Sequence, residues 1–292
     1  MSHPFRLIAP ALLLWAASLW AQVLWAEIRQ TDSYVWRLSD PDFGGFSGLH
    51  VEPDGLHFLA LSDRANLFRG RFERDATGRI TGVTEVTRTA LPDENGVPIE
   101  GMRADSEGLA VTPDGRIFTS FEGIARLRVE DAGGGLPRRL PRHPDFQSMQ
   151  LNSALEALAV GPDGALYTIP ERSGRVDRPF PVYRLRGEVW DIPFTIPRRG
   201  AFLVAGADIG PDGLLYVLER DFTGLGFRSR VRRFDLSGGA EETLFESRTG
   251  EHDNLEGISV WRDPSGDLVL TMIADDNFRW FQSTEILELR MD

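Results

Sequence analysis

The amino-acid sequence predicts an all-β fold built from repeated four-stranded units. Three observations support this: one motif recurs five times, each copy contains a hairpin signal, and short strand-like segments follow the copies. The copies, in chain order, read FSGLHVEPDGLHFLALSDR, DSEGLAVTPDGRIFTSFEG, NSALEALAVGPDGALYTIPERSG, VAGADIGPDGLLYVLERDF and NLEGISVWRDPSGDLVLTMIADDNF. They begin at Phe46, Asp105, Asn152, Val204 and Asn254.

Each copy predicts a β-hairpin that opens its unit. A Pro-x-Gly turn, which is Pro-Asp-Gly in four copies and Pro-Ser-Gly in the last, separates two apolar segments. Proline presets φ at one corner of such a turn, and glycine supplies the positive φ that closes the hairpin. Segments with an alternating apolar pattern then follow, namely NLFRGRFER, GVTEVTRTAL, IARLRV, VYRLRGEVWDIPFTI, SRVRRFDL and ETLFESR. This period of two predicts half-buried strands that complete the units.

The last copy is short of one strand, and the N-terminal region can supply it. Only TEILELRM follows the fifth hairpin, whereas SYVWRL, which begins at Ser33, precedes the first copy. Pairing these two segments would close a ring. Four-stranded units arranged radially form a β-propeller, which leaves few exposed sheet edges. The number of copies favours five blades, and six would fit if one blade has lost the repeat sequence.

The N-terminal segment, residues 1–26, is predicted to be separate from a single domain at 27–292. One arginine, Arg6, precedes an apolar run from Leu7 to about Ala26 that ends in small residues. This pattern indicates an export signal, and its length also allows a retained membrane anchor. We therefore expect a bacterial periplasmic or secreted protein, with no membrane contact for the mature chain unless this segment is retained.

Composition excludes several classes of function. The chain has 292 residues, with 32 basic against 44 acidic side chains and a net charge of −12. Nucleic-acid binding needs a basic surface, so a nucleic-acid partner is not expected. The sequence contains neither Lys nor Cys. Schiff-base lysines, thiol nucleophiles, thiolate metal sites and disulfides are thereby excluded.

Acidic residues recur where a propeller would place them around its central channel. The first strand of each blade lines the channel, and Glu107, Glu156 and Glu256 stand at its start in three copies. Ser47 holds this place in the first copy, and Asp208 lies three residues further along in the fourth. The second strand returns to the same face, where the predicted ends are Asp63, Glu122, Glu171, Glu219 and Asp275.

Crowded carboxylates need protons, arginines or a cation. Oxygen-only donors favour Ca²⁺, and then Mg²⁺, whereas the five histidines show no paired zinc-ligand spacing. The expected metal ligands are Glu107, Glu156, Asp208, Asn254, Glu256, Asp275 and Asp276. Of these, Glu107, Glu156, Glu256 and Asp275 are also the expected catalytic residues. Arg64, Arg172, Arg220 and His252 are the expected binding residues for a small anionic ester.

A structural role is the alternative for the same residues. An acid at the start of an inner strand can accept backbone N–H groups from the next blade, and an arginine after a second strand can form an inter-blade ion pair. In that case the protein would be a propeller that binds a ligand or another protein without catalysis.

Several motifs resemble one known family. They are GGFSGL, LALSDR, RADSEGLAV, FEG, NSALEALAV, YTIPERSG, FLVAGADIGPDG, ERDF, HDNLEGISVW and DDNFRWFQSTEILE, in chain order. From about Gly44 to Glu288, the chain resembles the phytase-like, or "esterase-like activity of phytase", proteins. The resemblance implies a bacterial exported β-propeller. Together with the acidic residues it suggests a calcium-dependent hydrolase of phosphate or other esters, and a gluconolactonase-type lactone hydrolase is a close variant.

Overall fold

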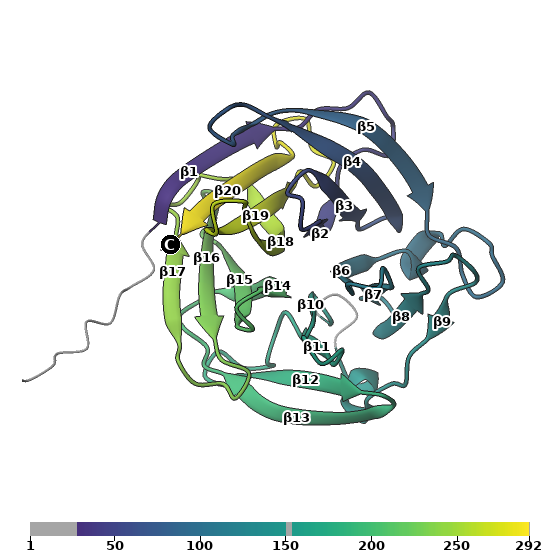
Figure 1. Ribbon diagram of the computed structural model, residues 1–292. Coiled ribbons are helices and arrows are strands. Elements are labelled where there is room, and N and C mark those ends of the chain that lie inside the picture. The colour runs from purple at the N-terminus through teal and green to yellow at the C-terminus, as the bar shows by residue number, and fades with distance from the viewer. Residues whose placement is uncertain (1–27, 150–153, 292) are drawn as a thin grey trace, which may run out of the picture.

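The structure, a computed structural model, describes residues 28–149 and 154–291 and forms a ring of five four-stranded antiparallel sheets (Figure 1). The prediction of a five-bladed propeller is therefore confirmed. The predicted export segment at 1–26 lies outside the described residues. Among the described residues, no helix has the length and apolar character needed to cross a membrane.

The blades follow the order of the sequence repeats. Blade 1 contains β2 (Phe46–Val51), β3 (His57–Ser62), β4 (Asn66–Arg74) and β5 (Ile80–Ala90). Blade 2 contains β6 (Ser106–Val111), β7 (Ile117–Phe121), β8 (Arg126–Glu130) and β9 (Arg138–Arg139). Blade 3 contains β10 (Ala157–Val160), β11 (Leu166–Ile169), β12 (Phe180–Arg186) and β13 (Val189–Ile196). Blade 4 contains β14 (Leu203–Ile209), β15 (Leu215–Phe222), β16 (Phe227–Phe234) and β17 (Glu242–Glu246).

Blade 5 closes the ring as the sequence predicts. It contains β18 (Asn254–Arg262), β19 (Leu268–Asp275), β20 (Glu285–Met291) and, at its outer edge, β1 (Ile28–Val35). β1 pairs antiparallel with β20, from Val35 opposite Glu285 to Ile28 opposite Met291. The strand begins upstream of the predicted Ser33 because β20 continues to Met291 and offers it partners. Two short 3₁₀ helices lie in the connections between blades: Gly101–Arg103 between blades 1 and 2, and Pro144–Gln147 between blades 2 and 3.

The inner strands β2, β6, β10, β14 and β18 meet around the axis (Figure 1). The space between them there is only about 10 Å³, so the centre is packed and is not an open channel. Glycines allow this close approach. A Cβ on Gly206 would lie 2.3 Å from the backbone oxygen of Glu256, and one on Gly108 would lie 2.6 Å from Leu158 Cβ. Glycine after the position of the repeated glutamate thus allows blade-to-blade packing, whether the preceding residue is Glu107 or Ala205.

An apolar cluster fills each of the five interfaces between neighbouring blades. For example, Trp36, which directly follows β1, stacks on Phe46 of blade 1 at 5.2 Å between ring centroids. Trp261 of blade 5 belongs to the same cluster. The other four clusters join blades 1 and 2, 2 and 3, 3 and 4, and 4 and 5. These interfaces hold the inner strands in fixed positions around the axis.

Candidate functional site

A β-bulge at the start of the inner strand positions the repeated glutamate. In blade 5, Leu255 pairs with Ala274 and Gly257 with Ile273, so Glu256 has no opposite residue. In blade 2 the pairing passes from Ser106 to Leu109 and skips Glu107. Bulges re-aim side chains and are frequent next to functional sites. Ser47 and Ala205 hold the bulge in blades 1 and 4, and Glu156 directly precedes β10 in blade 3.

The end of the second strand supplies another side chain from every blade. Asn254 pairs with Asp275, and Leu203 pairs with Arg220. Backbone hydrogen bonds mark the corresponding place in blades 1 to 3: Asp63 N donates to Gly45 O (2.7 Å), Glu122 N to Asp105 O (2.8 Å) and Glu171 N to Ala154 O (3.1 Å). Asp63, Glu122, Glu171, Arg220 and Asp275 are therefore equivalent residues.

The sequence prediction placed Glu219 among these strand ends, and the structure corrects it. In the structure Glu219 pairs with Val204, one position before the mouth, and its side chain turns into blade 4. There it accepts hydrogen bonds from Arg230 and Arg232. The alternation of a strand sends neighbouring residues to opposite faces, so Arg220 takes the place at the mouth.

Together these positions form one end of the propeller axis, which we call the acidic mouth. Its members are Asp63, Asp105, Glu107, Glu122, Glu156, Glu171, Glu256 and Asp275, with Arg220 and Asn254. Arg220 donates to Glu256 Oε1 (2.5 Å) and to Glu171 Oε1 (3.3 Å). Asn254 Nδ2 donates to the same Glu256 oxygen at 2.7 Å. Arg220 thus pairs with two of the eight carboxyls of the mouth.

The pKa values of the acidic mouth reflect this imbalance. Burial, and then the neighbouring carboxylates, raise the pKa of Glu107 well above its usual range. Burial does the same to the pKa of Glu156, although Arg220 opposes it. Burial also raises the pKa of Asp63 and of Glu122 to about 7, and that of Asp275 to about 8. At neutral pH the mouth must therefore retain protons or bind a cation.

Three of these acids are arranged as metal ligands could be. One carboxylate oxygen each of Asp105, Glu107 and Glu122 lies within 4.8 Å of the other two. All three come from blade 2, where Asp105 precedes β6, Glu107 occupies its bulge and Glu122 follows β7. The sequence-based ligand set contained Glu107 but neither Asp105 nor Glu122. The signal was present in DSEG and FEG, whose acids flank the inner hairpin of one blade.

The structure does not bring Asp208 to the acidic mouth. It stands near the end of β14, three residues beyond the bulge, and a strand advances roughly 10 Å over three residues. Its carboxylate accepts from Val260 N at 2.7 Å and from Ile209 N at 2.8 Å, so it fastens blade 4 to blade 5. It lines a cavity at the opposite end, among the Pro-x-Gly turns.

Asp276 lies next to the mouth and holds a loop together. Its oxygens accept from Gly45 N and Phe278 N, both at 3.0 Å, and from Thr284 Oγ1 at 3.2 Å. These bonds use much of its capacity as an acceptor, which is why it is a weaker candidate for a metal ligand than its neighbours in the mouth.

The four predicted binding residues have different surroundings. Arg220 lies inside the mouth, and Arg172 pairs with Glu171 at 2.9 Å on its edge. His252 pairs with Glu285 at 2.9 Å in a groove with Phe222 and Phe281. Arg64 lies over the ring of Phe278, with its Cζ 3.3 Å from the ring centroid. The structure therefore does not gather these four residues at one point.

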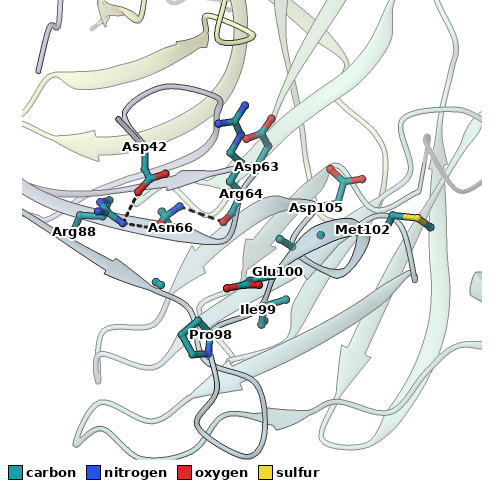
Figure 2. Close-up of a pocket in the computed structure, with 13 residues that line it drawn as sticks. Asp42, Asp63, Arg64, Asn66, Arg88, Pro98, Ile99, Glu100, Met102 and Asp105 are labelled. Carbon is teal, nitrogen blue, oxygen red and sulfur yellow. Dashed lines mark hydrogen bonds and ion pairs between the residues drawn. The ribbon is translucent and has the colours of Figure 1, made fainter. Parts of the chain in front are cut away.

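A cavity opens beside the acidic mouth, between blades 1 and 2 (Figure 2). Its volume of about 620 Å³ is in the range of small-molecule sites. Asp63 and Asp105 belong both to the mouth and to this cavity, and Arg64 stands beside Asp63. On its other side Arg88 pairs with Asp42 at 2.9 Å. A small molecule in the cavity would therefore contact acids of the mouth directly.

Comparisons with known proteins give a family and a fold. The family model described as "Phytase-like: Esterase-like activity of phytase" matches residues 41–278. A search of curated proteins finds no match. Among solved structures, the chain is similar to an aldose sugar dehydrogenase from Streptomyces coelicolor (16% identity, 90% of this chain and 99% of that chain, TM-score 0.51). It is also similar to an α-L-arabinofuranosidase from Podospora anserina (12% identity, 88% and 94%, TM-score 0.53). At such identities the likeness concerns the fold alone.

Proposed function

The chain belongs to the phytase-like family, and on this premise we propose that it is a calcium-dependent hydrolase of phosphate or other esters that acts at the acidic mouth. The observation that carries the proposal is the convergence of eight carboxyls from four blades, with Arg220 among them and Arg172 at their edge. Glu122 and Asp275 accept backbone N–H groups, as residues needed only for stability would. Among the described residues, no arginine or backbone N–H group donates a hydrogen bond to Glu107 or Glu156, which a purely structural role does not explain.

The chemistry of the donors suits calcium. Ca²⁺ takes six to eight oxygen ligands in flexible geometry, and the mouth offers carboxylate and amide oxygens only. Asp105, Glu107 and Glu122 would hold the ion most directly, because their oxygens already lie within 4.8 Å of one another. When bound, such an ion would neutralise the carboxylates and polarise an ester oxygen.

The chain's own residues supply the remaining functions. Arg64 stands at the cavity beside the mouth and can hold an anionic group of the substrate. Asp63 lines the same cavity, and burial raises its pKa to about 7. A carboxyl with such a pKa can accept or donate a proton near neutral pH, which is what a general acid or base requires. We therefore assign proton transfer to Asp63, and substrate binding to Arg64.

Turnover of para-nitrophenyl phosphate and para-nitrophenyl acetate tests the proposal. At least one ester should be hydrolysed with Ca²⁺, and activity should be lost in chelator and return when Ca²⁺ is restored. Glu107→Gln should lower kcat by about 100-fold or more, because it removes a ligand. Asp208→Asn, at the opposite end of the axis, is the matched control and should keep full activity. Equal turnover in chelator, or by Glu107→Gln, would refute the role of the mouth.

A ligand-binding propeller without catalysis is the second candidate. A groove of about 880 Å³ contains the exposed side chains of Phe222, Leu225 and Phe281 near the mouth, and exposed apolar surface often marks binding sites. In that case Ca²⁺ would stabilise the fold while neither ester, nor a sugar lactone added as a third substrate, would be turned over.

A further inference from the structure

A second cavity next to the acidic mouth is lined by four arginines. It measures about 710 Å³, lies along blade 3, and contains Arg172, Arg175, Arg178 and Arg198. Two of them already have carboxylate partners: Arg172 pairs with Glu171, and Arg175 with Asp177, both at 2.9 Å. Such a concentration of guanidinium groups is unexpected in a chain whose net charge is −12.

The other two arginines lack such partners. Within the described parts of the chain, neither Arg178 nor Arg198 lies at ion-pair distance from a carboxylate. The Nε of Arg198 is buried and has no hydrogen-bond partner there. Its Cζ lies 5.5 Å from the ring centroid of Phe180, against the core of blade 3. Because this Nε is shielded by the protein, a molecule in the cavity would contact the terminal nitrogens of Arg198, which line the cavity side.

The remaining lining decides what kind of molecule would fit beside these two arginines. Asp145 is the acid in the lining, and it already accepts a hydrogen bond from Tyr183 Oη at 3.0 Å. The unpaired arginines therefore leave an excess of positive charge. Met149, Val176 and Ile192 add apolar surface. The volume far exceeds what a bare oxyanion needs and falls within the range of sites for small organic molecules.

We propose that this cavity binds a phosphate monoester, with Arg178 and Arg198 holding the phosphoryl oxygens and the apolar residues contacting the organic group. Guanidinium groups match the geometry of phosphate oxygens and form charge-assisted hydrogen bonds to them. The inference is independent of the hydrolase proposal, because it uses neither a metal nor the carboxyls of the mouth.

Calorimetric titrations of the full chain with inorganic phosphate and with phenyl phosphate test this site. Chelator is present throughout, so that a metal in the mouth cannot bind the anion. Both ligands should bind, and phenyl phosphate should bind more tightly because its ring reaches the apolar lining. Arg178→Gln and Arg198→Gln should each weaken phenyl phosphate binding by about tenfold or more, the usual effect of losing charge-assisted hydrogen bonds.

Arg186→Gln is the matched control. It makes the same charge change in the same blade, but Arg186 pairs with Asp163 outside the cavity. The Arg186→Gln variant should bind phenyl phosphate as tightly as the parent chain does. Arg178 is exposed, so Arg178→Gln keeps the test valid even if Arg198→Gln disturbs folding.

Three results would overturn the proposal. The first is no binding of phenyl phosphate below about 10 mM. The second is an equal loss of affinity in Arg186→Gln, which would show general electrostatic attraction instead of a site. The third is phosphate binding with no gain from the phenyl group, which would identify free phosphate as the ligand.

Discussion

Two groups of carboxyls lie side by side in the propeller and are neutralised in opposite ways. In blade 4, Glu219 accepts from Arg230 (2.8 Å) and from Arg232 (2.5 Å). Arg232 also pairs with Glu241 (2.7 Å), which pairs in turn with Arg199 (2.8 Å). We call these five residues the blade-4 network. At the acidic mouth, eight carboxyls converge, but Arg220 pairs only with Glu256 and Glu171, and Arg172 pairs with Glu171 at the edge.

The pKa values of the two groups differ accordingly. The hydrogen bond from Arg199, supported by Arg232, lowers the pKa of Glu241 to about 2. Burial among other acids raises the pKa of Asp275 to about 8. Glu219 and Arg220 are neighbours in β15, yet one belongs to the network and the other to the mouth. A buried acid is therefore a poor sign of function by itself, and the shortage of cations around it is the more informative feature.

The largest expected effect comes from breaking the blade-4 network. Glu219→Gln leaves Arg232, which is fully buried, without its main counter-charge. Breaking a buried ion pair by removing one partner typically costs about 3–5 kcal/mol. Chemical denaturation should show a loss of this size, unchanged by Ca²⁺. A loss below about 1 kcal/mol would show that the blade-4 network does not stabilise the fold.

The same substitution at the mouth should behave differently. Glu107→Gln removes a buried carboxyl that its neighbours repel, so the calcium-free protein should be as stable as the parent chain or more so. The parent should gain about 2.7 kcal/mol from Ca²⁺ at 100 times its Kd, and the variant should lose most of that gain. Thermal melts with and without Ca²⁺ measure both effects. Equal calcium stabilisation of the two proteins would contradict this assignment.

The two groups should also give opposite pH dependence. Acids of the mouth, such as Asp63 and Asp275, have folded pKa values of about 7 and 8, above those of the unfolded chain. Their contribution is complete below about pH 4 and is lost as the pH rises through 7 to 8. Glu241, with its lowered pKa, contributes above about pH 4.5 and loses this as the pH falls towards 2.

Denaturation in chelator across the pH range checks this prediction. Stability should fall from about pH 5 to pH 8.5, and Ca²⁺ should remove most of the fall, because the ion replaces the protons. A flat profile in chelator over this interval would mean that the carboxyls of the mouth are already neutralised by the protein itself.

The smallest effect on calcium binding is expected at the opposite end of the axis. Asp208→Asn keeps one acceptor oxygen for the two backbone N–H groups of Val260 and Ile209, so stability should fall by roughly 1–3 kcal/mol, equally with and without Ca²⁺. The difference between melts with and without Ca²⁺ should equal that of the parent chain. A loss of calcium stabilisation in this variant would mean that the ion is not bound at the mouth.

The repeated motif was sufficient to predict the five blades, the closure by β1 and β20, and a common position for Glu107, Glu156 and Glu256. These features depend on local turn chemistry and strand alternation, which short segments encode. Register is different. In blade 4, Arg220 pairs with Leu203 and therefore reaches the mouth, whereas Glu219 pairs with Val204 and does not. Asp208 pairs with Tyr216, towards the opposite end.

Partner choice was also beyond the sequence. Arg172 and Arg220 look like free anion-binding groups in the sequence, but the fold places them against Glu171 and Glu256. The unpaired pair, Arg178 and Arg198, is separated by the outer strands of blade 3 and meets only in the folded cavity. Except for Arg172 with its neighbour Glu171, these contacts join residues far apart in the chain, so no local pattern reveals them.

The central claim is that the carboxyls of the acidic mouth together bind a cation. Calcium titrated into weakly buffered protein at pH 7, with heat and pH followed together, tests it most directly. The account predicts binding with release of protons, because acids with raised pKa values must ionise, and loss of both signals in the Glu107→Gln, Glu122→Gln double variant. Two results would contradict it. One is no binding at millimolar Ca²⁺; the other is binding that releases no protons and that persists in the double variant.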